Sequence, residues 1–274
     1  MASTTSDSGL GLSIDDVALR FVAPAGALTA LERCSLEIPA GSFTVVIGPN
    51  GCGKSTLLRL LAGLLQPDAG TVTVGGAPAR AGDPRVGLAF QQPRLVPWRS
   101  TLDNVALPLE LAGVSLASRR ASAEQALERV GLAAAAGMRP RELSGGMAQR
   151  AALARALITD PAVLLLDEPF SALDALTRET FDTELQRLWL ERRRTVVLVT
   201  HSVPEAVALG DRVAVMTARP GRVARVIPVD LPRPRPAELL GDARAAEIAG
   251  EIRGVLASEH ALELRPWAEQ AGAA

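Results

Sequence analysis

Several residue types are scarce in this sequence, and their scarcity excludes some classes of protein function. The 274 residues include no tyrosine and only two cysteines, Cys34 and Cys52. Two cysteines give neither a disulfide framework nor the spacing of a metal site, which favours a reducing compartment. The net charge of −1 argues against a broad electrostatic grip on nucleic acid or anionic lipid, since both need a basic excess. We therefore expect no nucleic-acid partner.

Long apolar runs are also missing. The longest uncharged stretch, residues 38–53, is interrupted by prolines, glycines and an asparagine, so it is too polar to span a bilayer. Residues 1–10 are rich in serine and threonine and do not resemble a secretory signal. We expect a flexible N-terminus over 1–10 and a protein that does not cross a membrane by itself.

Lysine is also scarce, because Lys54 is the single lysine among 29 basic residues. Because the chain uses arginine at its other basic positions, the single lysine suggests a position that arginine cannot fill. A compact ammonium and a flat guanidinium are not equivalent groups. By the same bias, the arginine-rich runs 192–194 and 233–235 carry little functional information.

Strand-like and helix-like patterns alternate along the chain. Apolar and β-branched runs predict strands over 12–22, 31–38, 42–47, 71–74, 86–90, 163–166, 195–200 and 212–217. Helical spacing of apolar residues predicts helices over 54–65, 118–130, 145–158, 175–193 and 242–258. The alternation predicts an α/β fold with a mainly parallel sheet, a helical subdomain inserted at about 92–160, and a linker or edge segment over 231–236.

A glycine-rich motif lies between the strand expected at 42–47 and the helix that follows. Residues 48–55 fit G-x-x-x-x-G-K-[ST], whose backbone N–H groups wrap a polyphosphate. Lys54 would contact the β- and γ-phosphates, Ser55 would ligate Mg²⁺, and Thr56 would add a phosphate contact. An accidental glycine-rich turn is the much rarer alternative. The candidate ATP-binding residues here are Gly48, Pro49, Asn50, Gly51, Cys52, Gly53, Lys54, Ser55 and Thr56.

Two adjacent carboxylates follow the apolar strand 163–166. At the carboxyl end of a strand, where open α/β sheets bind ligands, Asp167 can hold Mg²⁺ through water. Glu168 can act as the base for, or orient, the attacking water. The alternative is a pair that merely caps the next helix.

Two further polar residues end predicted strands. His201 closes the strand 195–200, which we place next to the strand ending in Asp167, and is a candidate γ-phosphate contact rather than a structural histidine. Gln91, directly after 86–90, has the reach for Mg²⁺ or the attacking water. These residues complete a predicted hydrolytic set of Glu168, His201 and Gln91, with Ser55, Gln91 and Asp167 as metal ligands.

The segment 143–150, Leu-Ser-Gly-Gly-Met-Ala-Gln-Arg, resembles the signature sequence LSGGQ of the ATP-binding subunits of ABC transporters, with Met147 in place of Gln. In that family the signature binds the γ-phosphate of ATP held by the opposite subunit, which would give this role to Ser144, Gly145 and Gly146. The resemblance also implies that Gln91 is the Q-loop glutamine, that 171–174 is the D-loop with Asp174, and that His201 is the switch histidine. Phe21 would stack on adenine.

The resemblance implies a P-loop NTPase fold of the ABC ATPase type. Such a fold has a mixed, mainly parallel sheet, an N-terminal antiparallel β part and the inserted helical subdomain. The ATPase domain would cover 11–240, followed by a helical tail over 241–274. It further implies a head-to-tail homodimer that binds ATP and Mg²⁺.

A finer resemblance points to the importers of the nitrate, aliphatic sulfonate and taurine group. It is carried by residues 90–99, FQQPRLVPWR, and 230–235, DLPRPR, although Gln92 replaces an acidic residue common in that group. The implied partners are an integral membrane permease and a periplasmic or lipid-anchored solute-binding protein, with the ATPase peripheral on the cytoplasmic face of the inner membrane. Residues 95–98 would either contact the permease or pack on their own domain. Import of a thiamine-precursor pyrimidine or another solute, and a soluble non-transport ABC ATPase, stay as alternatives.

Overall fold

The structure, a computed structural model, describes residues 9–23, 26–169 and 175–271. It divides the chain into two compact units: unit 1 consists of residues 1–81 and 182–274, and unit 2 of residues 82–181. Unit 1 therefore contains the glycine-rich motif and His201. Unit 2 contains Gln91, the signature segment and the acidic pair, and the predicted helical insert lies within its sequence.

Unit 1 begins with an antiparallel sheet of strand order β2-β1-β4-β5. Its strands are β1 (Leu12–Ala23), β2 (Gly26–Ile38), β4 (Ala69–Val74) and β5 (Ala77–Pro78). Along the second half of β2, buried and exposed residues alternate, as expected for a strand with one solvated face. The predicted antiparallel β part is thus confirmed. The first half of β2 was not predicted from sequence, because its residues 26–28 are exposed and show no apolar alternation.

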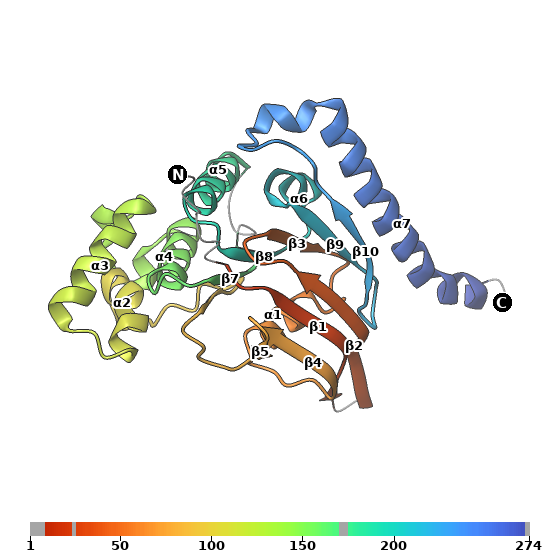
Figure 1. The fold of residues 1–274 in the computed structure, drawn as a ribbon, viewed down its shortest axis with the longest axis horizontal. Helices are drawn as coiled ribbons and strands as arrows, with labels where there is room; N and C mark the ends of the chain where they lie inside the picture. Colours follow the sequence, from red (N-terminus) through yellow and green to blue (C-terminus); the bar gives the residue numbers. More distant parts are fainter. Residues whose placement is uncertain (1–8, 24–25, 170–174, 272–274) are drawn as a thin grey trace, which may run out of the picture. The chain divides into compact units, whose positions relative to one another are not determined.

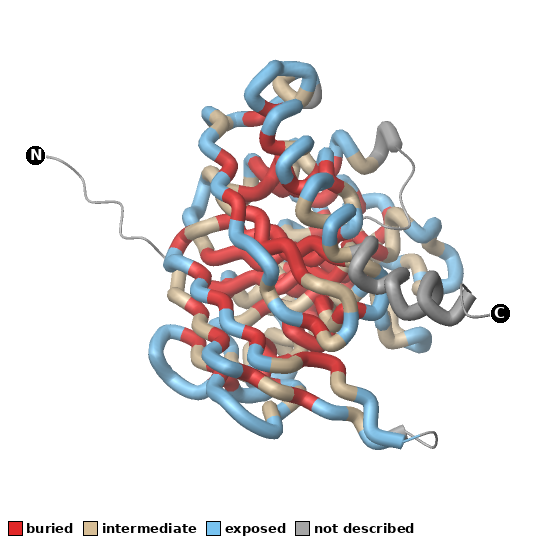
Figure 2. The backbone as a smooth tube through the Cα atoms, turned by 90° about the vertical axis from the view of Figure 1, so that its right-hand side faces the viewer, coloured by how far each residue is buried: buried red, intermediate tan, exposed pale blue. Residues whose placement is uncertain are grey.

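A second sheet in unit 1 provides the frame for the glycine-rich motif. Strands β8 (Thr195–Thr200) and β9 (Arg212–Met216) flank β3 (Phe43–Ile47) in parallel, and β10 (Val223–Pro228) pairs with β9 antiparallel. Every residue of β3 and β8 is buried, and both strands are nearly continuous apolar runs. Figure 2 shows the buried parts of the backbone in red. The sheet is mixed and mainly parallel, as predicted. Strand β10 was not predicted, because its residues 224–226 are exposed.

Three helices of unit 1 pack around these strands. Helix α1 (Lys54–Leu61) contacts β4 and β8, so it lies between the two sheets. Helix α7 (Ala243–Ala271) packs against α6 (Val203–Leu209), β9 and β10 (Figure 1). The prediction for α1 was four residues too long, because Gly63 turns the chain with a φ of +67°. The short helix α6 was not predicted.

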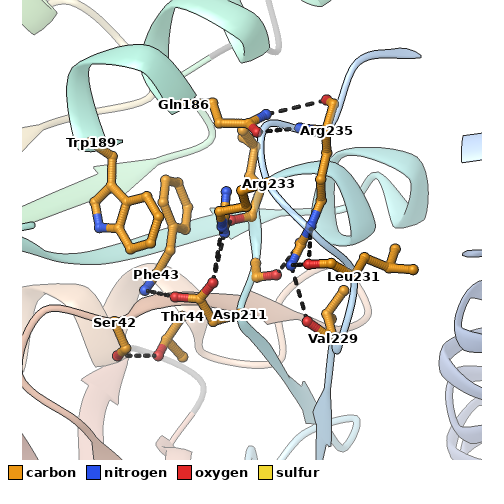
Figure 3. A network of polar contacts seen from close by, with 12 residues as sticks. Ser42, Phe43, Thr44, Gln186, Trp189, Asp211, Val229, Leu231, Arg233 and Arg235 are labelled. Carbon is orange, nitrogen blue, oxygen red and sulfur yellow. Dashed lines mark hydrogen bonds and ion pairs between the residues drawn. The ribbon is translucent and has the colours of Figure 1, made fainter. Parts of the chain in front are cut away.

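The segment 231–236, predicted as a linker or edge, is fixed by the buried Arg235 and the half-buried Arg233 (Figure 3). Arg235 is 4% exposed, and its guanidinium donates to the backbone carbonyls of Val207, Gly210, Val229 and Leu231. Burial lowers the pKa of Arg235 to about 10. Arg233 donates to Asp211 and lies 4.4 Å from the ring centre of Trp189. These arginines are structural, in keeping with the small functional weight given to the arginine-rich runs.

Unit 2 combines a two-stranded parallel pair with helices. Strand β6 (Val86–Ala89) pairs with β7 (Val163–Asp167). Helices α2 (Thr101–Leu111), α3 (Leu116–Arg129) and α4 (Gly145–Leu157) share one apolar core, with the short helices η1 (Ala133–Ala135) and η2 (Pro140–Glu142) before α4. The expected helical content of the insert is confirmed. Helix α5 (Ala175–Glu191) joins the sequences of the two units, and η3 (Ala237–Gly241) precedes α7.

Among the described residues, no helix combines the length and the apolar character needed to cross a membrane. The predicted flexible N-terminus, apart from Gly9 and Leu10, lies outside these residues.

Candidate functional site

The glycine-rich loop of unit 1 connects β3 to α1, as predicted. Two of its glycines adopt left-handed backbone angles, with φ of +77° at Gly51 and +103° at Gly53. Gly53 is the N-cap of α1 and no side chain caps this helix. A helix begins with N–H groups that have no acceptor within the helix, and its dipole adds positive character there, so this helix start can bind an anion.

Close packing explains a third glycine in the loop. A Cβ on Gly48 would lie 2.9 Å from the Cys52 sulfur and 3.0 Å from the Cβ of Met216. Cys52 itself is buried, and burial raises the pKa of its thiol. The thiol is thus protonated near neutral pH, which agrees with the interpretation of Cys52 as a small loop residue rather than a redox group.

Lys54 lies inside the loop with only 5% of its surface exposed. Its Nζ donates to the backbone oxygens of Gly48, at 2.9 Å, and Pro49, at 3.0 Å. The only lysine of the chain therefore points its charge into the backbone cradle. Thr56 is buried, and Ser55 is half-buried on the same first turn of α1. The structure thus places the predicted phosphate-binding residues of this motif together.

The acidic pair of unit 2 follows the fully buried strand β7. Asp167 ends the strand and is 5% exposed. Glu168 is half-buried and has a φ of +44°, a left-handed conformation that non-glycine residues rarely adopt. Such local strain persists where the surrounding structure holds it, and it clusters at functional sites.

Gln91 and Glu168 are brought together, which the sequence alone did not indicate. The Gln91 Nε2 donates to a carboxylate oxygen of Glu168 at 3.1 Å. This contact orients the carboxylate that was assigned to the attacking water. A carboxylate held in this way can accept a proton from a bound water.

Helix α4 holds the chain on both sides of Gln91. Gln149 is buried and its Nε2 donates to the Phe90 oxygen at 3.2 Å. Arg155 donates to the backbone oxygens of Pro93, at 2.7 Å, and Arg94, at 2.9 Å. Burial lowers the pKa of Arg155. These two positioning residues were missed, because helical spacing does not reveal which backbone a polar side chain will meet.

The signature segment opens α4, as predicted. Ser144 is the N-cap of the helix, and its hydroxyl accepts a hydrogen bond from the Met147 N–H at 3.2 Å. Ser144 and Gly145 are exposed, whereas Met147 packs partly buried against the helical core of unit 2. The departure from the family's glutamine therefore falls on a side chain turned toward the core.

Three predicted site residues remain: His201, Phe21 and Asp174. His201 is exposed and follows β8 directly, one residue before Ser202, the N-cap of α6. Phe21 is half-buried in β1, where it pairs with Leu28 of β2. Asp174 and the rest of the predicted D-loop lie outside the described residues.

The loop 95–98, predicted either to contact a permease or to pack on its own domain, packs on its own domain at Leu95 and is exposed at Trp98. Leu95 packs against the helical core of unit 2, and the Val96 N–H donates to Asn104 at 2.7 Å. Trp98, by contrast, is 75% exposed. Of this loop, the tryptophan is the large apolar side chain that a partner could reach.

Comparisons with known proteins agree with this geometry. The family model described as ABC transporter matches residues 31–171. The taurine import ATP-binding protein TauB of Rhizobium johnstonii is 45% identical over 255 residues, 90% of this chain and 97% of that protein. The aliphatic sulfonates import ATP-binding protein SsuB of Pseudomonas fluorescens is 49% identical over 227 residues, 83% of this chain and 81% of that protein.

A solved structure gives the same fold. The dimeric post-hydrolysis state of the ATP-binding cassette MJ0796, bound to ADP and Pi, superposes with a TM-score of 0.74 at 32% identity, covering 80% of this chain and 99% of that chain. The predicted P-loop NTPase fold of the ABC ATPase type is thereby confirmed. Together with the loop that connects β3 to α1, these relations show an ATPase that binds ATP, and the chain belongs to the ABC transporter family as an ATP-binding subunit.

Proposed function

We propose that this chain energises the import of a small anionic solute, of the aliphatic sulfonate, taurine or nitrate type, through a separate membrane permease. The observation that carries the proposal is its 45% and 49% identity to proteins named for taurine and aliphatic sulfonate import. The sequence of residues 90–99 and 230–235, similar to that importer group, supports the same solute class.

We assign the binding and hydrolysis of one ATP to the following residues. Lys54 and the first turn of α1 hold the β- and γ-phosphates, and Phe21 stacks on adenine. Glu168, oriented by Gln91, accepts the proton of the attacking water, and His201 contacts the γ-phosphate. The buried, lone lysine and the Gln91–Glu168 hydrogen bond support these roles.

Magnesium fits the residues assigned to it. Ser55, Asp167 and Gln91 offer hydroxyl, carboxylate and amide oxygens, and oxygen donors are the ligands that Mg²⁺ prefers. When bound, the ion neutralises phosphate charge during transfer. Asp167 ends the fully buried strand β7 and is itself almost wholly buried.

Two copies of the chain form a head-to-tail dimer around ATP. Ser144, Gly145 and Gly146 of one copy bind the γ-phosphate held by the loop of the other copy, and Asp174 is assigned to the same nucleotide site. The exposure of Ser144 and Gly145 and the dimeric state of MJ0796 support this arrangement. The dimer works peripherally at the cytoplasmic face of the inner membrane, where the exposed Trp98 is offered to the permease. A periplasmic or lipid-anchored protein delivers the solute.

Growth on single nutrient sources tests this proposal. A strain that lacks this gene is complemented with the wild-type chain or with Lys54→Ala, and grown with taurine or an alkanesulfonate as sole sulfur source, or nitrate as sole nitrogen source. We expect the wild type, but not Lys54→Ala, to restore growth on one of these sources, while sulfate and ammonium support all strains. Equal growth of all strains on every source would contradict the proposed solute class.

A further inference from the structure

A second loop of unit 1 lies against the phosphate-binding loop. It is the turn 217–222 between β9 and β10, called here the β9–β10 loop. A Cβ on Gly221 of this loop would lie 1.9 Å from the Cys52 oxygen, so only glycine fits there without displacement. Met216, at the end of β9, has its Cβ and backbone oxygen 3.0 and 3.1 Å from a Cβ built on Gly48. The two loops therefore pack backbone against backbone.

The β9–β10 loop is itself firmly held. The Thr217 N–H donates to the Arg222 oxygen at 2.9 Å, and the Arg222 N–H donates to the Thr217 hydroxyl at 3.0 Å. Gly221 also joins β2, since its N–H donates to Ala30 at 2.9 Å and its oxygen accepts from the Glu32 N–H at 3.2 Å. The loop is thus a fixed support rather than a free turn.

From this support, Arg219 reaches the phosphate-binding loop. Its Nε and Nη2 both donate to the Gly51 oxygen, at 3.1 and 2.9 Å. Gly51 has a φ of +77°, and a Cβ there would lie 2.8 Å from Nη2. Two charged N–H groups on one carbonyl form a strong, directional contact. Arg219 is otherwise exposed, so this contact is not a by-product of core packing.

The Gly51 carbonyl belongs to the peptide group that closes the turn at the tip of the loop. The Cys52 N–H of the same peptide group donates to the Pro49 oxygen at 3.3 Å, which closes the turn 49–52. Because the peptide group is planar, a fixed carbonyl also fixes its N–H. Lys54 holds the oxygens of Gly48 and Pro49, so Arg219 and Lys54 hold different carbonyls of one loop.

We propose that Arg219 is a positioning residue for ATP binding, which holds the turn 49–52 of the phosphate-binding loop in place before the nucleotide arrives. The inference rests on the proposed assignment of residues 48–56 to the phosphates of ATP. Because Arg219 already orders this turn, ATP binding does not carry the free-energy cost of ordering it, and preorganisation of this kind strengthens binding. It leaves the chemical step to other residues, so its loss changes the affinity and not the turnover of the bound state.

Kinetics of purified variants of the full chain test the proposal. Arg219→Ala is expected to raise the KM for MgATP about tenfold, the order expected for one charge-assisted hydrogen bond, and to keep kcat within about twofold. Arg219→Lys, whose ammonium can still donate to the Gly51 oxygen, is expected to recover most of this loss. Arg222→Ala is the matched control, because Arg222 belongs to the same loop but pairs with Glu32. It is expected to leave the KM within about twofold of wild type.

Calorimetric titration with MgATP separates this inference from the proposed function. Lys54→Ala is expected to abolish binding. If it does, and Arg219→Ala binds as wild type does, the inference on Arg219 is overturned while the assignment of the loop stands. If Lys54→Ala binds normally, the assignment itself fails. If Arg219→Ala does not fold, Arg219→Lys and Arg219→Gln are titrated instead. Wild-type MgATP affinity in Arg219→Gln together with weaker affinity in Arg219→Lys would overturn the role of the donated charge.

Discussion

Helices α1 and α4 both begin at glycine-containing motifs assigned to the phosphates of ATP, but they begin differently. Helix α1 follows Gly53, whose φ is +103°, and no side chain caps it. Helix α4 follows Ser144, whose φ is −66° and whose hydroxyl accepts from the Met147 N–H. At α1 the N-cap residue offers no side-chain acceptor to the first turn, whereas at α4 the hydroxyl of Ser144 satisfies one N–H group within the protein.

By this difference, the N-terminus of α1 is suited to bind a ligand, whereas the N-terminus of α4 is stabilised by its own cap. A residue larger than glycine at position 53 would place its Cβ 2.8 Å from the Leu31 side chain, so α1 has no room for a capping residue there. Helix α4 is exposed at its first residues and has its own cap. We infer that ATP affinity depends mainly on the loop before α1, and that the start of α4 acts in the closed dimer.

The largest effect is expected for Glu168→Gln, which touches neither helix start. Loss of a positioned base typically slows a reaction by 10² to 10⁴, so hydrolysis should fall by roughly a hundredfold or more. ATP should still bind, because Lys54 and α1 are unchanged. Measurement of phosphate release and of MgATP affinity checks both parts, with Glu124→Gln on exposed α3 as the matched control. Wild-type turnover in Glu168→Gln would contradict the assignment of the base.

The second prediction concerns a substitution in the phosphate-binding loop at the N-terminus of α1. Lys54→Arg keeps the charge but places a wider, planar group where Nζ lies within 3.0 Å of two backbone oxygens and 5% of the residue is exposed. We expect MgATP affinity to fall by about tenfold or more, since the guanidinium does not fit the ammonium's position. Arg59→Lys, on the same helix, makes the reverse exchange and should bind ATP as wild type does. Normal affinity in Lys54→Arg would show that the loop accepts either cation.

The third prediction concerns the N-cap of α4. Ser144→Ala removes the hydroxyl that accepts from Met147, and loss of such a cap lowers the free energy of unfolding by about 1 kcal/mol. Urea denaturation without nucleotide measures this change. Ser144→Gly is the control, because glycine at an N-cap costs only a few tenths of a kcal/mol. Equal stability of the alanine variant and wild type would remove the contrast between the two helix starts.

Much of the frame around these starts could be predicted from the sequence. The strand 195–200 was predicted at its observed ends, and the motif 48–55 falls between β3 and α1 as expected. In both cases a fully buried apolar run is a local signal that needs no knowledge of its neighbours. The signature segment was likewise placed at a helix start, because serine followed by glycines favours that position.

The contacts that hold these motifs could not be predicted in the same way. Gln149 and Arg155 reach backbone oxygens about 60 residues earlier in the chain, at separations of 59 and 61 to 62 residues. Arg219 reaches Gly51 over 168 residues. In a chain so rich in arginine, composition does not single out the arginines that make such contacts, and only tertiary packing decides which carbonyls they meet.

The smallest effect is expected at Cys52, which tests whether the loop before α1 is as closed as its packing indicates. Burial raises the pKa of Cys52, and it raises the pKa of Cys34 to about 11, so both thiols are protonated at neutral pH and are poor nucleophiles. Iodoacetamide at pH 7, followed by peptide mass spectrometry, should label both far more slowly than a free thiol, with faster labelling as the pH rises. Cys52→Ser should bind MgATP within about twofold of wild type, because the backbone of the loop forms the cradle. Rapid labelling of Cys52 at pH 7 would mean that the loop opens readily without ATP, and the contrast with α4 would then lie in mobility rather than in capping.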